Sequence, residues 1–265
     1  MSYSAPRDPI RIGITAISFV VLAAITTPLL VTAITAFNAT TETAFPPNGW
    51  SLRWFENIFN RPELIAGFWL SLKLALLASA ITITLATTTA LIMTRHAFPG
   101  RDLLDAVLMS PLIVPQVITG LSFLIFFVRV EANSQFWNLL LVHVLLTLPY
   151  ALRVVRSSLL RVNPKLEEAA MGLGASPLVS FFRITLPQIR AGLFVALFFS
   201  FVVSFDNFTA TAFLTTSGAT LPVEMFLYIE ASLDPTISAI SALMIISTTV
   251  FVLFVDRLVG INRIT

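Results

Sequence analysis

The stretch Asn163–Arg190, NPKLEEAAMGLGASPLVSFFRITLPQIR, is the one polar segment of any length in the second half of an otherwise apolar sequence. Of the 265 residues, 57% are hydrophobic and 11% are charged. Soluble domains carry about 45–50% apolar and about 25% charged residues, so this composition indicates an integral membrane protein. The polar segment is therefore expected to lie at a membrane surface, held there by apolar helices.

The composition also excludes several classes of site. The sequence has no Cys and only two His, which removes disulfides, thiol nucleophiles and thiolate metal sites and leaves little for a His-built metal centre. We expect no metal site. The net charge of +2 does not indicate nucleic acid as a partner, because the basic residues are distributed by membrane side and form no single basic face.

Six apolar runs are each long enough to cross a hydrocarbon core of about 30 Å. They cover about residues 12–37, 64–93, 103–128, 136–155, 191–214 and 236–255. The first run exceeds the length of a signal-peptide core and is expected to be an uncleaved helix. Pro111 and Pro115 interrupt the third run, so we expect that helix to break and to face protein or a cavity. Between the first two runs, Trp50 and Trp54 indicate a connector with an interfacial helix.

The basic residues orient these spans. One side of the predicted membrane collects twelve Lys and Arg residues, the other side collects three, and Lys73 lies within the second span, which accounts for all sixteen. The positive-inside rule then places both termini and the polar segment in the cytoplasm. The side with twelve contains Arg7, Arg11, Arg95, Arg101, Arg153, Arg156, Arg161, Lys165, Arg183, Arg190, Arg257 and Arg263, and the other contains Arg53, Arg61 and Arg129.

Local signals predict two short helices in the polar segment. Asn163-Pro164 and Ser176-Pro177 each combine a helix-capping residue with a proline suited to the first helical turn. Gly172 and Gly174 are able to end the first helix, because glycine adopts left-handed backbone angles without steric cost. The product is a helix, a tight turn and a second helix, with an apolar surface that suits docking of a partner protein. That surface comprises Leu166, Ala169, Ala170, Met171 and Leu173.

The same segment resembles the EAA loop of the transmembrane subunits of bacterial binding-protein-dependent ABC importers. Glu168-Ala169-Ala170 is followed after three residues by Gly174 and, after nine more, by Ile184-Thr185-Leu186-Pro187. The resemblance covers most of the chain and implies an all-α membrane protein of the type I importer permease fold. The implied fold has six transmembrane helices, with both termini inside the cell and a cytoplasmic coupling helix between the fourth and fifth spans. The resemblance implies that residues 1–265 form a single permease domain, with 1–62 as N-terminal tail, first span and periplasmic loop, 63–260 as the five-helix core, and 157–190 as the coupling loop within it.

What the resemblance implies about partners is specific. No G-x-x-x-x-G-K-[ST] motif is present, so ATP chemistry is expected on another chain and no catalytic residue on this one. The expected partners are two cytoplasmic ATPase subunits that bind ATP and Mg²⁺, a second permease subunit that we expect to be a different chain, and a periplasmic solute-binding protein. The expected location is the bacterial inner membrane, crossed several times. The coupling residues would be Glu168, Ala169, Ala170, Gly172, Gly174, Leu186 and Pro187.

Asp206 is the clearest candidate for contact with a solute. It is the one acid predicted well inside a span, where a carboxylate is costly and so indicates function. The segments SFDNFTATAFLT and LPVEMFLYIE resemble the spermidine/putrescine branch of the family, which implies a polyamine or related organic cation. An opine, a phosphonate or another small organic ion is an alternative, and a purely structural role for Asp206 stays open. The candidate translocation residues are Ser204, Asp206, Asn207, Thr209 and Gln116.

Two other function classes deserve comparison. An intramembrane hydrolase would need a nucleophile and a base on facing helices, and His143 is the one imidazole within a span, with no recognisable serine motif beside it. We expect His143 to be packed and hydrogen-bonded rather than catalytic. A passive channel would have no need of a cytoplasmic segment that docks a partner protein. A permease subunit of an importer accounts for both the spans and the polar segment.

Overall fold

The computed structural model describes residues 9–42, 44–232 and 234–259, and within them every regular element is a helix. The predicted all-α class is confirmed. The elements in chain order are α1 (Pro9–Thr35), α2 (Arg53–Phe59), α3 (Pro62–Arg95), α4 (Arg101–Met109), η1 (Ser110–Leu112), α5 (Gln116–Arg129), α6 (Gln135–Leu159), α7 (Pro164–Gly172), α8 (Pro177–Ser180), η2 (Phe181–Thr185), α9 (Leu186–Phe205), α10 (Thr209–Leu214), α11 (Leu221–Ala231) and α12 (Thr236–Val259).

The chain divides into two compact units. Residues 1–62 and 227–265 form the first unit, and residues 63–226 form the second. Among the described residues, the first unit contains α1, α2 and α12, and the second contains the helices from α3 to α10. The boundary at residue 226 falls within α11.

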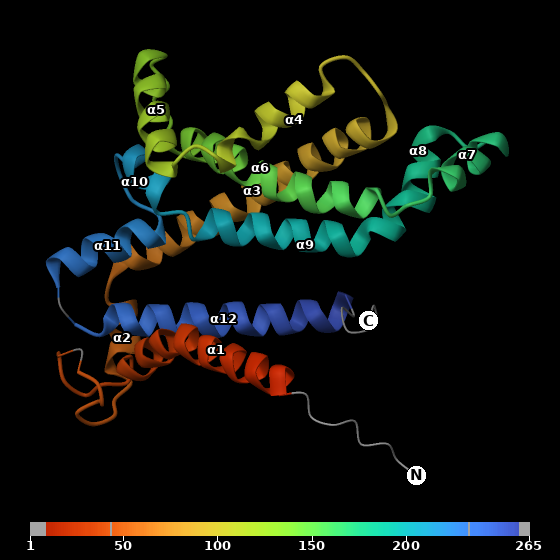
Figure 1. Ribbon diagram of the computed structural model, residues 1–265. Coiled ribbons are helices and arrows are strands. Elements are labelled where there is room, and N and C mark those ends of the chain that lie inside the picture. The colour runs from red at the N-terminus through yellow and green to blue at the C-terminus, as the bar shows by residue number, and fades with distance from the viewer. Residues whose placement is uncertain (1–8, 43, 233, 260–265) are drawn as a thin grey trace, which may run out of the picture. The chain divides into compact units, whose positions relative to one another are not determined.

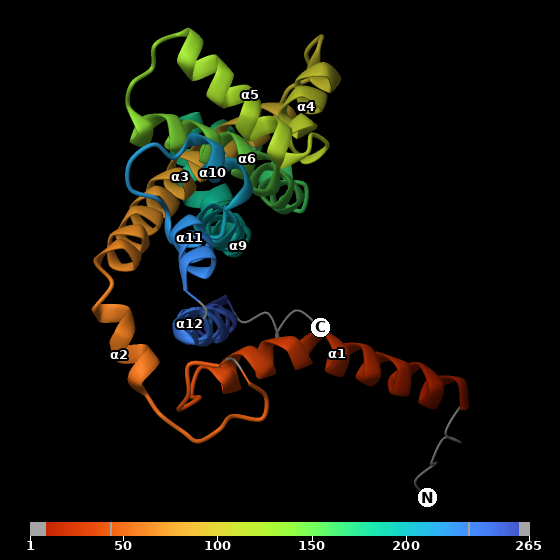
Figure 2. The same ribbon diagram turned by 90° about the vertical axis from the view of Figure 1, so that its left-hand side faces the viewer.

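The first unit has a small core where the end of α1 meets α12. Ala36, Ala239 and Ala242 are buried there against Trp54 of α2. The Trp54 indole N–H donates a 2.7 Å hydrogen bond to the Asn38 carbonyl, which satisfies its polar end inside the core. Figure 2 shows α12 end-on with α1 running away from it, so these two helices meet near one end. The helix expected in the tryptophan-containing connector is confirmed as α2.

A polar network ties α2 to the segment before α12 in the first unit. Asp234 accepts hydrogen bonds from the Tyr228 hydroxyl at 2.7 Å and from the backbone N–H of Thr236 at 2.9 Å. Asn57 donates to the Thr236 hydroxyl at 2.9 Å. Burial raises the pKa of the Asp234 carboxyl, but hydrogen bonds from Thr236 and Tyr228 and the charge of Arg61 outweigh it and hold that pKa below its ordinary value.

The second unit is built on the pair α6 and α9, which run side by side in Figure 1. Small residues allow the close approach: a Cβ added at Gly192 of α9 would lie 2.8 Å from the Ser158 Cβ of α6. A second close approach joins α5 to α10, because a Cβ at Gly120 would lie 3.0 Å from Ala210 Cα. These contacts fix the helices that carry the candidate functional residues.

Five described helical segments are long and apolar enough to cross a membrane on their own. They are Gly13–Thr35, Pro62–Arg95, Gln135–Leu159, Pro177–Phe205 and Thr236–Leu253. The third predicted span corresponds to the pair Arg101–Leu112 and Gln116–Arg129, which is long and apolar enough only when taken together and is bent by 101° at the predicted proline break.

Two expectations about the later part of the chain need correction. A continuous helix over 191–214 is wrong, because α9 ends at Phe205 and the separate helix α10 begins at Thr209. Asp206 and Asn207 between them belong to the residue types that compete with helix interiors by local hydrogen bonding. The connector left between the predicted spans 191–214 and 236–255 is not an open loop, because it contains the helix α11.

Candidate functional site

The polar segment contains the two short helices that its caps predict. α7 begins after Asn163, whose side-chain oxygen accepts a hydrogen bond from the Lys165 backbone N–H at 3.1 Å. α8 begins after Ser176, whose hydroxyl oxygen accepts one from the Val179 backbone N–H at 3.3 Å. In both cases the next residue is a proline at the first helical position, where a backbone N–H would have no acceptor within the helix, so its absence costs no hydrogen bond. The prediction of a helix, a turn and a helix is confirmed.

The turn between the two helices depends on Gly174. Its φ of +92° is in the left-handed region, which costs glycine nothing and other residues about 1–2 kcal/mol. The Ala175 N–H donates to the Ala170 carbonyl and the Gly174 N–H to the Met171 carbonyl, both at 3.0 Å. These are the two bonds of a Schellman motif, which satisfies the carbonyls at the end of α7. Gly172 remains helical, so of the two predicted glycine stops only Gly174 makes the turn.

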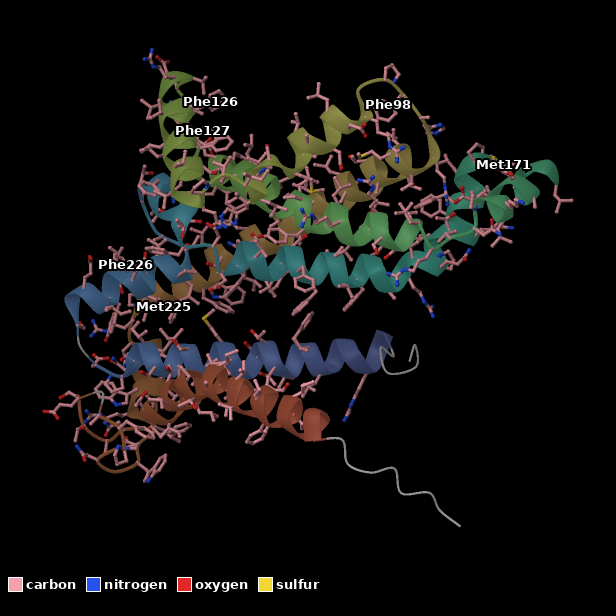
Figure 3. The ribbon with its side chains drawn as sticks, in the orientation of Figure 1. Phe98, Phe126, Phe127, Met171, Met225 and Phe226 are labelled. Atoms are coloured by element: carbon pink, nitrogen blue, oxygen red, sulfur yellow. The ribbon has the colours of Figure 1, made fainter. Side chains whose placement is uncertain are left out.

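The predicted docking surface on α7 is uncovered in this chain. Leu166 is 47% exposed and Leu173 is 91% exposed, and the Glu168 side chain also faces solvent. Figure 3 shows Met171 on α7, beyond the adjoining ends of α6 and α9. Exposed leucine and methionine side chains on a short rigid helix suit a protein partner. Of the remaining predicted coupling residues, Ala169 and Pro187 are exposed, and Ala170 and Leu186 are half-buried.

Sequence reasoning missed the residue that anchors α7 to the rest of the second unit. Glu167, beside the predicted Glu168, places its carboxylate Oε1 3.0 Å from Nη2 of Arg95 at the end of α3. The same oxygen accepts a hydrogen bond from the Thr185 hydroxyl. Glu167 and Arg95 are each 17% exposed, so the pair is largely shielded from water. The one local signal was that Glu167 is the acidic residue in the first turn of a helix.

The junction between α8 and α9 is a π-helix. η2 covers Phe181–Thr185, directly before Leu186 and Pro187 of α9. Pro187 has no N–H to donate to the carbonyl four residues earlier, so a regular α-helical bond is impossible there. Single π-helical turns concentrate at functional positions. The predicted Leu186-Pro187 pair therefore marks the place where the polar segment enters the fifth span.

Several candidate translocation residues meet in a buried polar chain. His143 of α6 contacts the Ser204 hydroxyl through Nδ1 at 2.7 Å and the Thr211 hydroxyl through Nε2 at 3.0 Å. Thr211 donates to the Asn207 side-chain oxygen at 3.1 Å, and the Asn207 amide donates to Gln116 Oε1 at 3.3 Å. His143 is thus packed and hydrogen-bonded as expected. This network of hydrogen bonds holds α5, α6, α9 and α10 together across the break after α9.

Asp206 and Thr209 stand apart from this chain of hydrogen bonds. Asp206 is the residue after the last turn of α9, and its side chain is exposed in this subunit. Among the described residues its carboxylate makes no hydrogen bond or ion pair, whereas Ser204 and Asn207 on either side are both engaged. Thr209 is half-buried at the start of α10. The expectation that Asp206 lies well inside a span is wrong, because the helix ends before it.

The hydrolase alternative receives one observation that the sequence did not predict. No serine motif in the sequence marks Ser204, yet its hydroxyl lies 2.7 Å from Nδ1 of the His143 ring. His143 is 2% exposed and Ser204 is 3% exposed, so the hydroxyl does not reach the surface of the chain. Within the described residues, no cluster of three or more His, Asp or Glu side chains is placed to hold a metal ion.

Comparison with known proteins identifies relatives over most of the chain. The family described as "Binding-protein-dependent transport system inner membrane component" matches residues 86–263. The putrescine transport system permease protein PotI of Escherichia coli K12 is 32% identical over 247 residues, covering 90% of this chain and 86% of PotI. The spermidine/putrescine transport system permease protein PotC of Haemophilus influenzae is 28% identical over 232 residues, covering 87% of this chain and 90% of PotC.

More distant relatives show the fold. A bacterial ABC transporter for import of the acidic polysaccharide alginate has a chain that superposes with a TM-score of 0.73 at 11% identity, covering 97% of this chain and 99% of its own length. A chain of the MetNI methionine ABC transporter superposes with a TM-score of 0.60 at 16% identity, covering 74% and 94%. The helices, the break at the prolines and the family match agree. This chain belongs to the family of inner membrane components of binding-protein-dependent transport systems.

Proposed function

We propose that this chain is one permease subunit of an ATP-driven importer and forms half of the pore for a polyamine such as putrescine or spermidine. The observation that carries the proposal is the 32% identity to PotI, a putrescine transport system permease, over 90% of this chain. The similarity to PotC, a spermidine/putrescine permease, extends over 87% of the chain and supports the same solute class.

The energy for transport comes, in this proposal, from other subunits. The chain has no G-x-x-x-x-G-K-[ST] motif for ATP phosphates. Two cytoplasmic ATPase subunits would bind ATP and Mg²⁺, and one of them would dock on α7, where Leu166 and Leu173 offer an exposed apolar surface. Closure of the ATPases would move α7, and the membrane helices would alternate between outward and inward access.

The remaining partners follow from the family and the charge pattern. A second permease, a different chain in our proposal, completes the pore, and a periplasmic binding protein delivers the solute. The bacterial inner membrane is the proposed location. The twelve-to-three distribution of Lys and Arg supports cytoplasmic termini and a cytoplasmic polar segment.

Asp206 supports a cationic solute. Its exposed carboxylate follows a membrane helix and lacks a cationic partner among the described residues, so an ammonium group would find an unshared opposite charge there. An anion would meet repulsion. The sulfate transport system permease protein CysT of Salmonella typhimurium is 30% identical over 177 residues, but this similarity covers 62% of the chain. The second candidate is a different solute for the same importer architecture, such as an opine, a phosphonate or another small organic ion.

Uptake into proteoliposomes tests the solute. The chain is reconstituted with its second permease, ATPases and binding protein, and radiolabelled putrescine and sulfate are offered outside with ATP inside. We expect ATP-dependent accumulation of putrescine and none of sulfate. Uptake of sulfate would overturn the polyamine assignment. So would a complex that hydrolyses ATP but takes up neither putrescine nor sulfate.

A further inference from the structure

One carboxylate connects three parts of the second unit at its polar end. Glu167 is in the first turn of α7, and its side chain pairs with Arg95 at the last residue of α3. It also accepts the hydrogen bond of Thr185, the last residue of η2. The Ser180 hydroxyl of α8 donates to the Glu167 backbone carbonyl at 3.4 Å. We call the set Arg95, Glu167 and Thr185 the α7 clamp.

The clamp and the docking surface use different sides of α7. Successive residues of an α-helix point about 100° apart, because a turn takes 3.6 residues. Glu167 therefore faces inward, where it is 17% exposed, while Glu168 faces solvent. The two adjacent acids have separate tasks. One is available to a partner and the other holds the helix in place.

The clamp reaches the two places where motion of α7 would enter the membrane helices. Arg95 ends the span α3, which is far from α7 in sequence and lacks a direct chain connection to it. Thr185, with 0% exposure, immediately precedes the span α9 at its π-helical junction. A charge pair with most of its water removed resists separation more than an exposed pair. Displacement of α7 would therefore pull on α3 and α9 together.

We propose that Glu167 is a positioning residue through which α7 transmits movement to α3 and α9. The inference rests on the proposed function, in which ATPase subunits move α7. Glu168 makes the outward contact, and Glu167 makes α7, the end of α3 and the start of α9 move as one body. Without the clamp, α7 would still bind its ATPase partner, but the turns on either side of α7 would bend and its movement would not reach α3 and α9.

The test separates coupling from general stability. Putrescine-stimulated and unstimulated ATP hydrolysis are measured for the reconstituted complex with Glu167→Gln, with Arg95→Gln, and with the exchanged pair Glu167→Arg plus Arg95→Glu. The matched control is Asp105→Asn, which removes one partner of another 3.0 Å ion pair in the same unit, Asp105 of α4 with Arg156 of α6, to which no α7 residue belongs.

We expect each single clamp substitution to lower putrescine-stimulated hydrolysis about tenfold, within the range seen for residues that couple sites. Unstimulated hydrolysis and complex yield stay as in the wild type, and the exchanged pair regains most of the stimulation. Asp105→Asn keeps the putrescine stimulation of the wild type. Wild-type stimulation in Glu167→Gln, or an equal loss in Asp105→Asn, would overturn the clamp.

A distance measurement covers the case in which Glu167→Gln fails to assemble with the ATPases. The sequence has no Cys, so nitroxide labels attach only at introduced His96→Cys and Leu173→Cys, both at exposed positions. In lipid, the permease with Glu167→Gln should show a broader label–label distance distribution than with Glu167 intact. An unchanged distribution would overturn the clamp. A wild-type complex that putrescine does not stimulate would count against the proposed solute, and the distance measurement would still decide the clamp.

Discussion

The crossing of α6 and α9 provides the sharpest test of how the second unit is held together. The perturbation is Gly192→Ala. The added Cβ would overlap the Ser158 hydroxyl and lie 2.8 Å from the Ser158 Cβ, whereas carbon atoms prefer about 3.5–4.0 Å. Rotating the hydroxyl away breaks its 3.0 Å bond to the Val154 carbonyl and does not relieve the carbon contact. The two helices must therefore separate.

The magnitude follows from these contacts. Overpacking costs about 1–3 kcal/mol, and losing the hydroxyl bond costs about 0.6 kcal/mol in a membrane protein. The glycine-to-alanine change offsets this by up to about 1 kcal/mol of helix propensity. Gly13→Ala in α1 is the matched control, because nothing lies within 4 Å of a Cβ at Gly13. Because the gain in helix propensity is common to both variants, we expect Gly192→Ala to lower the free energy of unfolding by about 2–4 kcal/mol relative to Gly13→Ala.

The assay is unfolding of the purified permease in SDS titrations, followed by circular dichroism. The double variant Ser158→Gly plus Gly192→Ala places the glycine on α6 instead of α9, so the crossing again has one residue without a side chain. We expect a favourable interaction energy of about 1–3 kcal/mol between the two substitutions. Equal stability of Gly192→Ala and Gly13→Ala, with no interaction energy, would refute the close crossing.

Three further predictions concern polar groups. Asp206→Asn should lower putrescine uptake about tenfold without lowering unstimulated ATP hydrolysis, because it removes the charge opposite an ammonium; unchanged uptake would assign Asp206 a structural role. His143→Leu should lower the free energy of unfolding in SDS by about 1–2 kcal/mol, because two buried hydroxyls lose a partner; an unchanged midpoint would contradict the network. The pKa of Asp234 lies below its ordinary 3.8, so its stabilising contribution is present above that pH and is lost as the pH falls through the folded-state pKa. Stability should therefore decline less below about pH 4 in Asp234→Asn than in the wild type, and parallel declines would contradict this sign.

Local signals account for the parts of the fold that the sequence predicted. The caps at Asn163 and Ser176 and the turn at Gly174 act over a few residues, so their chemistry specifies two short helices without knowledge of the rest. The break at Pro115 follows equally from a missing backbone donor. Lipid imposes the long spans, because backbone groups inside it must be satisfied within a helix.

Non-local contacts account for what the sequence did not predict. Glu167 and Arg95 are 72 residues apart, and although Glu167 is the acid in the first turn of α7, that position does not show that it faces inward and Glu168 outward. The end of α9 at Phe205 was missed because the apolar run continues through residue 214. Hydrogen bonds from His143, 61 residues from Ser204, fix that break from outside the segment.

The most direct test of the central claim is putrescine-stimulated ATP hydrolysis by the reconstituted complex when the polar segment is altered. Glu168→Ala removes the outward carboxylate of α7, and Gly174→Val forces a branched side chain into a turn with φ of +92°. If this chain receives the work of ATP hydrolysis through α7, both variants will lose putrescine stimulation and uptake while α6 and α9 stay folded. Full stimulation and uptake in both variants would contradict the account.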